Sequence, residues 1–500
     1  MLPFPGDDTL SLDDSSPLHA RWVEWKLRCN ADFYRDLREY VAKVRPGTLV
    51  TAYDIDRELC DGGGRTGYRA DMFSQTTDFF GSEPCSINLY MNYRNYLALR
   101  KIMLSLSRAH GHPVWALTYG WGMKDNSLEG LLGWMLATLS AHGVWVGQEL
   151  THPAFAWKER MDSRHVESVA DVAVLYRPDA RSFVGARWQP YMEALGISET
   201  LGDQNLLHDF VTQADLAHPE RLARYRVLVL GNVNILSNAE LATLANWVKA
   251  GGRLLVSGTF AQVDGDYEPR NNATLAELTG VKNSNEFVEL QPGETDVFGQ
   301  KLPLPPRMVP FELQGAEALA RLADGRVWLA RNRVGAGEVW TSALPLGEAQ
   351  CEKQFFRGQR YDFSYDARLS AWAPALVTAV HKEAFPVAVG GAVPKEQRLE
   401  VYRDRNNGRL YCHWASFRGT RGDIVGKVPP AEFPLDAFKD AVDMDMKFDG
   451  TYVQAYAVSP DFKGKLPLPC ANANGRTRVT LPGKDLTHYT LVVLEKEPAK

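Results

Sequence analysis

Helical patterns and short apolar runs alternate between residues 18 and 159, and this alternation constrains the fold more than any other feature of the chain. A helical pattern that ends at Pro46 and Gly47 precedes the run TLVTAYDID. The runs QTTDFFGSEP, PVWALTYGW and VWVGQELTHP follow, and a helical pattern precedes each of the last two. Buried parallel strands joined by crossover helices have this pattern. We therefore expect a parallel sheet, with half of the strands that a closed β/α barrel needs.

A second pattern begins near residue 169, where longer apolar runs alternate with helices. DVAVLYRP, YRVLVLGNV and GRLLVSGT are typical of the buried strands of a doubly wound sheet. We expect a helix in FVGARWQPYMEALG to end at Gly196. The helix within SNAELATLANWVKAGG is marked more clearly, because Ser237 and Glu240 match a capping box and Gly251 can terminate it.

From about residue 386 the strands become short and turn residues separate them. Asn406, Asn407 and Gly408 predict a hairpin between two strands, and a similar hairpin is expected in GRTRVTLPGKDLTHYTLVVLEKE. The predicted fold class is α/β. It comprises a partial (β/α) barrel over 1–165, a flavodoxin- or amidotransferase-like doubly wound domain over 166–385, and a small β-sandwich over 386–500.

Composition excludes several classes of function. The net charge is −5 with both signs mixed along the chain, which argues against a nucleic-acid partner and against a polybasic membrane anchor. No apolar run is long enough to span a bilayer, and the first residues lack the pattern of a secretory signal. The six cysteines have neither zinc-finger nor disulfide-framework spacing. We expect a cytoplasmic protein that needs no metal or cofactor.

The residues after the four barrel-like runs are the candidates for chemistry, because barrel enzymes place their active sites at the carboxyl ends of strands. These residues are Asp54 and Asp56, Glu83, Tyr119 and Trp121, and Glu149 and His152.

Glu83 and Glu149 are the predicted catalytic carboxylates. Hydrolysis of a glycoside needs two carboxyl groups, about 5–5.5 Å apart for retention or about 6.5–9.5 Å apart for inversion. The remaining five residues are predicted to bind substrate, since aromatic faces suit sugar rings and carboxylates suit hydroxyl groups. Structural alternatives stay open: the two aspartates can cap a turn, Glu149 can pair with arginines at the rim, and the tryptophan can fill a core.

Two stretches resemble a known family. They are RYRVLVLGNVNILSNAELATLANWVKAGGRLLVSGTFAQVDGD and RLEVYRDRNNGRLYCHWASF. With the order of the three regions, they resemble the β-galactosidase family in which a barrel precedes an amidotransferase-like trimerisation domain. The second stretch is similar to a strand that ends in a His-Leu-x-Asn-like motif, here His413 to Ser416.

The resemblance implies positions for the family's catalytic residues. It makes the four runs the fifth to eighth barrel strands, so the acid/base glutamate of the fourth strand would precede Met1. The nucleophile of the seventh strand would fall on Tyr119 or Gly120. We therefore expect a glycoside hydrolase-like protein that acts on or binds a carbohydrate and is catalytically incomplete as this chain. The alternative is a non-catalytic carbohydrate-binding or structural relative.

The middle region is expected to serve assembly. No cysteine lies between Cys85 and Cys351, so the nucleophile for amidotransferase chemistry is missing from the core of this region. The resemblance implies a homo-oligomer, and a trimer in particular.

Overall fold

The computed structural model describes most of the chain. The described residues are 17–52, 69–82, 93–118, 134–135, 138–141, 143–146, 154, 157, 161, 165–181, 189–270, 272–284, 286–347, 368–391, 393, 397–417 and 442–496.

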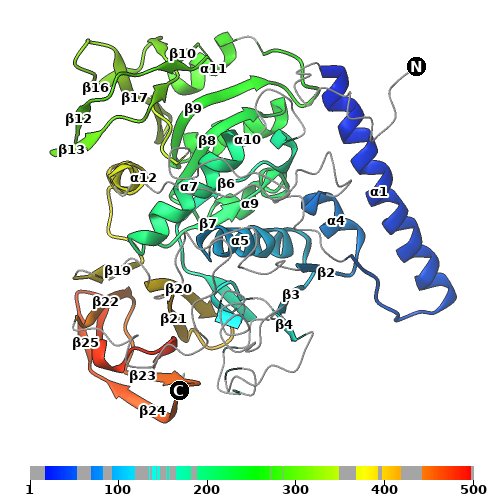
Figure 1. The fold of residues 1–500 in the computed structure, drawn as a ribbon, viewed down its shortest axis with the longest axis vertical. Helices are drawn as coiled ribbons and strands as arrows, with labels where there is room; N and C mark the ends of the chain where they lie inside the picture. Colours follow the sequence, from blue (N-terminus) through cyan, green and yellow to red (C-terminus); the bar gives the residue numbers. More distant parts are fainter. Residues whose placement is uncertain are drawn as a thin grey trace.

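The first part of the chain contains the parallel sheet that the sequence predicts. Strands β1 (Thr51–Ala52), β2 (Phe79–Ser82), β3 (Val114–Thr118) and β4 (Gly143–Val146) lie side by side in sequence order, and all three pairings are parallel. The long helix α1 (Pro17–Val44) precedes the sheet in the chain. Helix α4 (Ala70–Thr76) connects β1 to β2, and α5 (Tyr93–His110) lies between β2 and β3 in the sequence. Figure 1 shows α1 along the outer edge and α5 between this sheet and the middle of the molecule.

A seven-stranded sheet forms the middle of the molecule, in the order β16-β17-β18-β9-β8-β6-β7. The five strands from β18 to β7 pair in parallel, whereas β17 pairs antiparallel with both β18 and the edge strand β16. Its strands are β6 (Val172–Leu175), β7 (Asp209–Val211), β8 (Val227–Ile235), β9 (Arg253–Val263), β16 (Glu317–Arg321), β17 (Val327–Val334) and β18 (Gly337–Ser342).

Both faces of this sheet are covered, which explains why its strands have continuous apolar runs. In β8, Val227 and Val229 belong to the core that includes residues of α7 (Gln189–Asp203) and α12 (Trp372–His381). The alternating Leu228 and Leu230 belong to the opposite core, which includes residues of α10 (Asn238–Lys249). The shorter helices α8 (Gln213–Leu216) and α9 (Pro219–Leu222) lie beside α10.

The capping box of α10 is confirmed. Ser237 Oγ accepts a hydrogen bond from the Glu240 backbone N–H at 3.2 Å, and the Glu240 carboxylate accepts one from the Ser237 N–H at 2.7 Å. Gly251 has a φ of 115°, a left-handed conformation that suits the end of a helix.

The predicted end of α7 at Gly196 is wrong, because the helix continues to Asp203. Gly196 instead allows a close approach of two chain segments. A Cβ atom at this position would lie 2.0 Å from the backbone oxygen of Gly347. The glycine therefore meets a packing requirement that a local helix-stop signal does not reveal.

A smaller insertion of one helix and three two-stranded sheets lies between β9 and β16. Its elements are α11 (Asn272–Thr279), β10 (Val281–Asn283) with β15 (Phe311–Leu313), β11 (Val288–Glu289) with β14 (Arg307–Met308), and β12 (Glu294–Val297) with β13 (Gln300–Pro303).

The last part of the chain forms two antiparallel sheets around one core. The first sheet has the order β19 (Val387–Gly390), β22 (Met444–Asp449), β26 (Arg476–Leu481) and β25 (Cys470–Ala473). The second has the order β24 (Phe462–Leu468), β23 (Gln454–Ser459), β27 (Tyr489–Glu495), β21 (Leu410–Ser416), β20 (Gln397–Asp404) and β5 (Val166–Ser168). The edge strand β5 comes from before the middle sheet, so this sheet joins distant parts of the chain.

One predicted hairpin is confirmed and the other is wrong. Strands β20 and β21 pair around the turn that contains Gly408, whose φ is 69°. Strands β26 and β27 also form, but they lie in different sheets. The residues between them form a short 3-10 turn (Gly483–Asp485) and carry the chain from one sheet to the other.

No helix in the described ranges is long and apolar enough to cross a membrane.

Glu193 is a buried carboxylate that joins three parts of the middle domain. It lies on α7 and accepts hydrogen bonds from Ser257 Oγ at 2.6 Å, from the Leu346 N–H at 2.6 Å and from the Gly347 N–H at 2.9 Å. Burial raises its pKa, and the three hydrogen bonds act against that rise. The contacts hold α7 against β9 and against the chain after β18.

We expect Glu193→Gln to lower the free energy of unfolding by about 1–3 kcal/mol. An amide has only one acceptor oxygen. Its NH₂ group would therefore face a buried N–H or O–H donor and could not accept a hydrogen bond from it. Denaturant unfolding measures the loss, and Glu220→Gln, at a side chain that is 72% exposed, provides the matched control. Equal stability of the two variants would contradict this role of Glu193.

Candidate functional site

The seven site residues predicted from the sequence lie outside the described residues. The structure does place the strands that precede them. Glu83 comes directly after β2 and Tyr119 directly after β3, while Asp54 and Glu149 follow β1 and β4 within three residues. Because the four strands are parallel and adjacent, their carboxyl ends share one edge of the sheet. The roles of the seven residues stay predictions.

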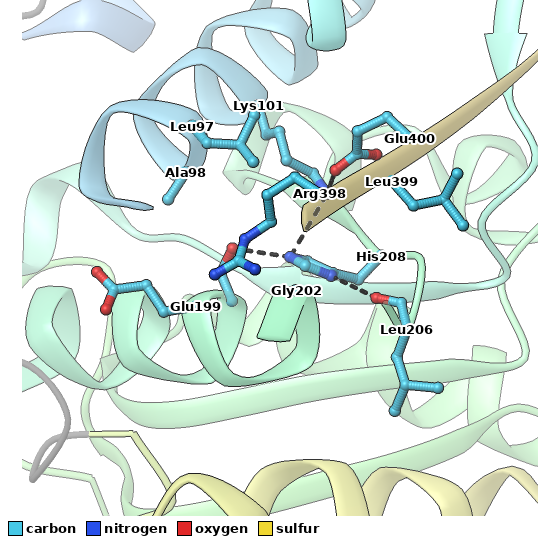
Figure 2. Close-up of a pocket in the computed structure, with 11 residues that line it drawn as sticks. Leu97, Ala98, Lys101, Glu199, Gly202, Leu206, His208, Arg398, Leu399 and Glu400 are labelled. Carbon is cyan, nitrogen blue, oxygen red and sulfur yellow. Dashed lines mark hydrogen bonds and ion pairs between the residues drawn. The ribbon is translucent and has the colours of Figure 1, made fainter. Parts of the chain in front are cut away.

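The described part of the chain contains a second candidate, a buried cluster of charged side chains that we call the charged junction (Figure 2). It lies where α5, α7 and β20 meet, so each of the three regions contributes to it. The residues that form its polar contacts are Lys101, Ser198, Asp203, His208, Arg398 and Glu400.

The ion pair between Lys101 and Glu400 is the central contact of the charged junction. Lys101 Nζ donates a hydrogen bond to Glu400 Oε1 at 2.6 Å, and both side chains are almost fully buried. Burial raises the pKa of Glu400, whereas the neighbouring ammonium of Lys101 lowers it. The pair joins α5 of the first region to β20 of the last.

His208 is held as a neutral imidazole with a defined tautomer. Its Nδ1 lies 2.9 Å from the carbonyl oxygen of Leu206, which can only accept, so Nδ1 carries the proton. Nε2 is then an acceptor and accepts a hydrogen bond from the Ser198 hydroxyl at 2.7 Å. Lys101 Nζ lies 3.5 Å from the same nitrogen. Burial, followed by the ammonium of Lys101, lowers the pKa of His208 to about 3.

A second ion pair joins Arg398 of β20 to Asp203 at the end of α7. Both side chains are buried. The last region is therefore attached to α5 by one buried ion pair and to α7 by another.

The serine–histidine contact looks like the start of a nucleophilic dyad, but the cavity rules out a substrate. The cavity in the charged junction holds about 20 Å³, which is room for about one water molecule. A sugar ring cannot reach Ser198 in this arrangement. We interpret the charged junction as a structural site that fixes the three regions relative to one another.

A further ion pair extends this network toward the middle sheet. Arg108 of α5 lies 3.2 Å from the Asp209 carboxylate, which also accepts a hydrogen bond from Tyr225 Oη at 2.9 Å. Burial by itself would raise the pKa of Asp209, but the guanidinium groups of Arg108 and Arg224 lower it to about 2.

An aromatic cluster lies on β21 and β27 beside the charged junction, because His413 is the cross-strand partner of Glu400. Tyr489 Oη and His413 Nδ1 are 2.7 Å apart, and His413 is fully buried. Trp134 and Trp157 pack edge-to-face against the Tyr489 ring, at centroid distances of 4.9 and 5.8 Å. His413, which the sequence marked within a family-like motif, contacts the first region through Met161, whose sulfur lies 3.3 Å from His413 Nε2. Burial lowers its pKa to about 3.

No sequence motif predicted the charged junction. The available signal was Arg100 and Lys101 inside the apolar helix YLALRKIMLSLSRAHG, both of which are buried. Among the described residues, no cluster of histidine, cysteine, aspartate or glutamate could hold a metal ion.

We expect Lys101→Met to destabilise the chain by about 3–5 kcal/mol, because it leaves Glu400 as a buried charge without its cation. The double variant Lys101→Met/Glu400→Leu should recover much of that loss. A double-mutant cycle from denaturant unfolding measures the coupling, and the exposed pair Arg21–Glu268 is the control, with an expected coupling below about 1 kcal/mol. Additive effects at Lys101 and Glu400 would show that the pair is not coupled.

We also expect the free energy of unfolding to decrease as the pH is lowered below about 6.5, the ordinary pKa of histidine. Between that pH and about 3, unfolded chains bind a proton at position 208 that folded chains do not. Each such histidine adds a slope of about 1.4 kcal/mol per pH unit. His208→Gln should therefore flatten the pH dependence of the unfolding free energy, whereas His218→Gln, at an exposed position, should leave it unchanged. An unaltered slope in the first variant would refute the neutral buried state.

Comparison with known proteins identifies the middle of the chain. Residues 170–358 match the family model described as the β-galactosidase trimerisation domain. None of the curated proteins compared with the chain matches it.

Several solved structures share the fold along nearly the whole chain. A β-galactosidase from Bacillus circulans sp. alkalophilus is 13% identical with a TM-score of 0.64, and the match covers 96% of this chain and 68% of that one. A cold-adapted β-galactosidase from Rahnella sp. R3 is 13% identical with a TM-score of 0.62, over 93% and 68%. The α-L-fucosidase isoenzyme 2 from Paenibacillus thiaminolyticus is 13% identical with a TM-score of 0.60, over 94% and 71%.

The resemblance stated from the sequence is thus confirmed. Residues 170–358 match the β-galactosidase trimerisation domain, and the chain shares the fold of these solved structures along nearly its whole length.

Proposed function

We propose that this glycoside hydrolase-like chain takes a carbohydrate at the carboxyl edge of the β1–β4 sheet. We also propose that the chain by itself hydrolyses ordinary aryl β-galactosides little or not at all. In this proposal the β1–β4 sheet is the carboxyl-terminal half of a β/α barrel, within a first domain of residues 1–165. The proposed bounds are 166–385 for the doubly wound domain and 386–500 for the β-sandwich, with β5 at the start of the former contributing an edge strand to the latter.

The names of the similar structures favour a carbohydrate as the ligand. Two are named as β-galactosidases and one as an α-L-fucosidase, and all three names describe enzymes that act on sugars. The order of strands in the β1–β4 sheet supports the place of binding. Parallel adjacent strands bring the residues after them to one edge, where aromatic and carboxylate side chains can together face a sugar.

One observation carries the proposal of low activity. Tyr119 and Gly120 follow β3, the strand that the resemblance equates with the one carrying the nucleophile. Neither residue has a carboxyl group. An oxocarbenium-like transition state needs a carboxylate beside it and a carboxylic acid at the leaving group, so rate acceleration falls steeply when either is missing. Glu83, which comes directly after the adjacent strand β2, is the candidate that we favour for a relocated carboxylate.

The same observation favours a second candidate function, a relative that binds carbohydrate without hydrolysing it. The two functions differ in what Glu83 and Glu149 do. In a hydrolase at least one of them acts on the glycosidic bond, whereas in a binding protein both contact sugar hydroxyl groups or stabilise the rim of the sheet.

We expect a panel of chromogenic glycosides to show little or no turnover of aryl β-galactosides, while calorimetry detects binding of a sugar. If turnover of any glycoside is seen, Glu83→Gln should reduce it by at least about a hundredfold, the usual effect of removing a general acid or base. Glu149→Gln is the matched comparison on the neighbouring strand.

The activities of the Glu83→Gln and Glu149→Gln variants distinguish the ways in which this proposal can be wrong. Activity that survives Glu83→Gln but not Glu149→Gln would mean that Glu149 is the catalytic carboxylate. Strong activity in both would mean that the proposed barrel order is wrong. Absence of both turnover and sugar binding over a broad panel would contradict the proposal of a carbohydrate ligand.

A further prediction concerns assembly through the trimerisation domain. We expect a homo-oligomer built on threefold contacts, because residues 170–358 match a domain that is named for this role. Light scattering should give a mass that is a multiple of three chains of 55.9 kDa. A monodisperse monomer at micromolar concentration would rule this assembly out. The cytoplasm stays the predicted location.

A further inference from the structure

A cleft on the middle domain, which we call the α10 cleft, lies apart from the β1–β4 sheet. It opens between α9, the carboxyl end of α10 and the segments that lead into β8 and β9, and its volume is about 550 Å³. Small-molecule sites occupy about 300–1,000 Å³, so the cleft is large enough for a ligand. The described residues that line it all lie within 219–383. Its polar and aromatic side chains include Arg226, Thr243, Asn246, Trp247, Arg253 and Glu383.

The indole of Trp247 is held in a fixed position in the α10 cleft. Its Nε1–H donates a hydrogen bond to the carbonyl oxygen of Leu222 at 3.1 Å. Gly252 lies directly against the ring, since a Cβ atom at position 252 would come within 2.5 Å of Trp247 Cδ2. A side chain that is already fixed loses little conformational entropy when a ligand packs on it. The cleft therefore contains a preorganised aromatic surface.

The carboxylate of Glu383 lies between two guanidinium groups at the α10 cleft. Its Oε1 is 3.1 Å from Arg253 Nη2, and its Oε2 pairs with Arg226 Nη1. Arg226 Nε also lies 3.4 Å from the Asp171 carboxylate, and Arg253 Nη1 donates a hydrogen bond to the His381 carbonyl oxygen. These contacts fix both arginines, while the Glu383 side chain remains 46% exposed.

This arrangement of charges favours a neutral ligand. Glu383 already occupies the place between the guanidinium groups that an anion would take, and the two guanidinium groups repel a cation. The guanidinium groups donate hydrogen bonds, the Glu383 oxygens accept them, and the side chains of Asn246 and Thr243 do both. A hydroxyl group also donates and accepts. A ligand that carries several hydroxyl groups therefore matches the polar groups of the cleft.

We propose that the α10 cleft binds a neutral saccharide. The apolar face of a sugar ring packs on the indole of Trp247, because tryptophan combines a large apolar surface with a polar edge. The hydroxyl groups of the sugar bond to Asn246, Arg226 and Glu383. The cleft is larger than one sugar ring, so a disaccharide binds more tightly than a monosaccharide. No described residue of the first region lines the cleft, so this second site is independent of the one proposed at the β1–β4 sheet.

Fluorine NMR of the full chain labelled with 5-fluorotryptophan tests this site, with lactose as the probe. The chain has 13 tryptophans, and the resonance that Trp247→Phe removes belongs to the α10 cleft. Lactose should shift this resonance saturably, and galactose should require a higher concentration. The resonance that Trp121→Phe removes reports on the proposed β1–β4 site in the same sample. A shift at Trp121 alone, or no shift at either position, overturns this inference. A shift at Trp247 alone counts only against the proposed function.

Two variants that leave the indole in place measure the polar contacts. Asn246→Ala and Thr243→Val each remove a hydrogen-bonding group, and each should weaken lactose binding at the Trp247 resonance by about two- to tenfold. Both side chains are at least partly exposed, so thermal unfolding should stay close to that of the native chain. Lys249→Ala is the matched control, because Lys249 is exposed on α10 and does not line the cleft. Equal lactose affinity in all three variants would refute the proposed contacts.

Galacturonate, which differs from galactose by a carboxylate, tests the charge of the ligand. It should bind the native α10 cleft more weakly than galactose does. In Glu383→Gln the two guanidinium groups lose their shared carboxylate, so the affinity for galacturonate should rise by at least about tenfold. Tighter binding of galacturonate than of galactose to the native chain would show that the ligand is an anion. A shift of the Trp247 resonance by adenosine but by no sugar would assign the cleft to a nucleoside, and either result overturns the proposal.

Discussion

The buried ion pair between Lys101 and Glu400 is the contact on which the arrangement of this molecule depends. Removing two charges from water costs several kcal/mol for each ion, so such a pair persists only where geometry and further hydrogen bonds offset the cost. His208 and Ser198 complete the polar contacts around it. Because the two charges come from α5 and β20, the first and last regions can form this contact in one relative position only.

The middle domain takes part in the same constraint. Arg398 and Asp203 tie β20 to α7, and Arg108 and Asp209 tie α5 to β7. One continuous hydrophobic core also runs through all three regions, with Ile102 of α5 in the same core as residues of the middle sheet and of β27. Apolar burial supplies most of the free energy, while the charged groups select one alignment of the surfaces.

The attachment of the three regions to one another determines which surfaces of the β1–β4 sheet remain available for binding. A sheet of four parallel strands has two edges and two faces, and a rigid attachment to other domains covers part of that surface. The charged junction lies on the side of α5 that faces the middle domain. The carboxyl ends of the strands are a separate surface, so ligand binding there can change without disturbing the junction.

The sequence by itself determined the parts of the secondary structure that depend on local contacts. The alternation before residue 159 predicted four parallel strands, and the capping box at Ser237 and Glu240 predicted α10, because both depend on contacts between near neighbours in the chain. It also placed the candidate carboxylates Glu83 and Glu149 after strands, although their roles lie beyond the described residues.

Tertiary structure decided what depends on distant partners. Lys101 and Glu400 are separated by 299 positions, and no local pattern tells which carboxylate a buried lysine will meet. Gly196 has the local character of a helix stop, yet it serves close packing against Gly347. Local sequence limits the conformations of a segment, but the cost of burying charge and the filling of space are settled only when remote segments come together.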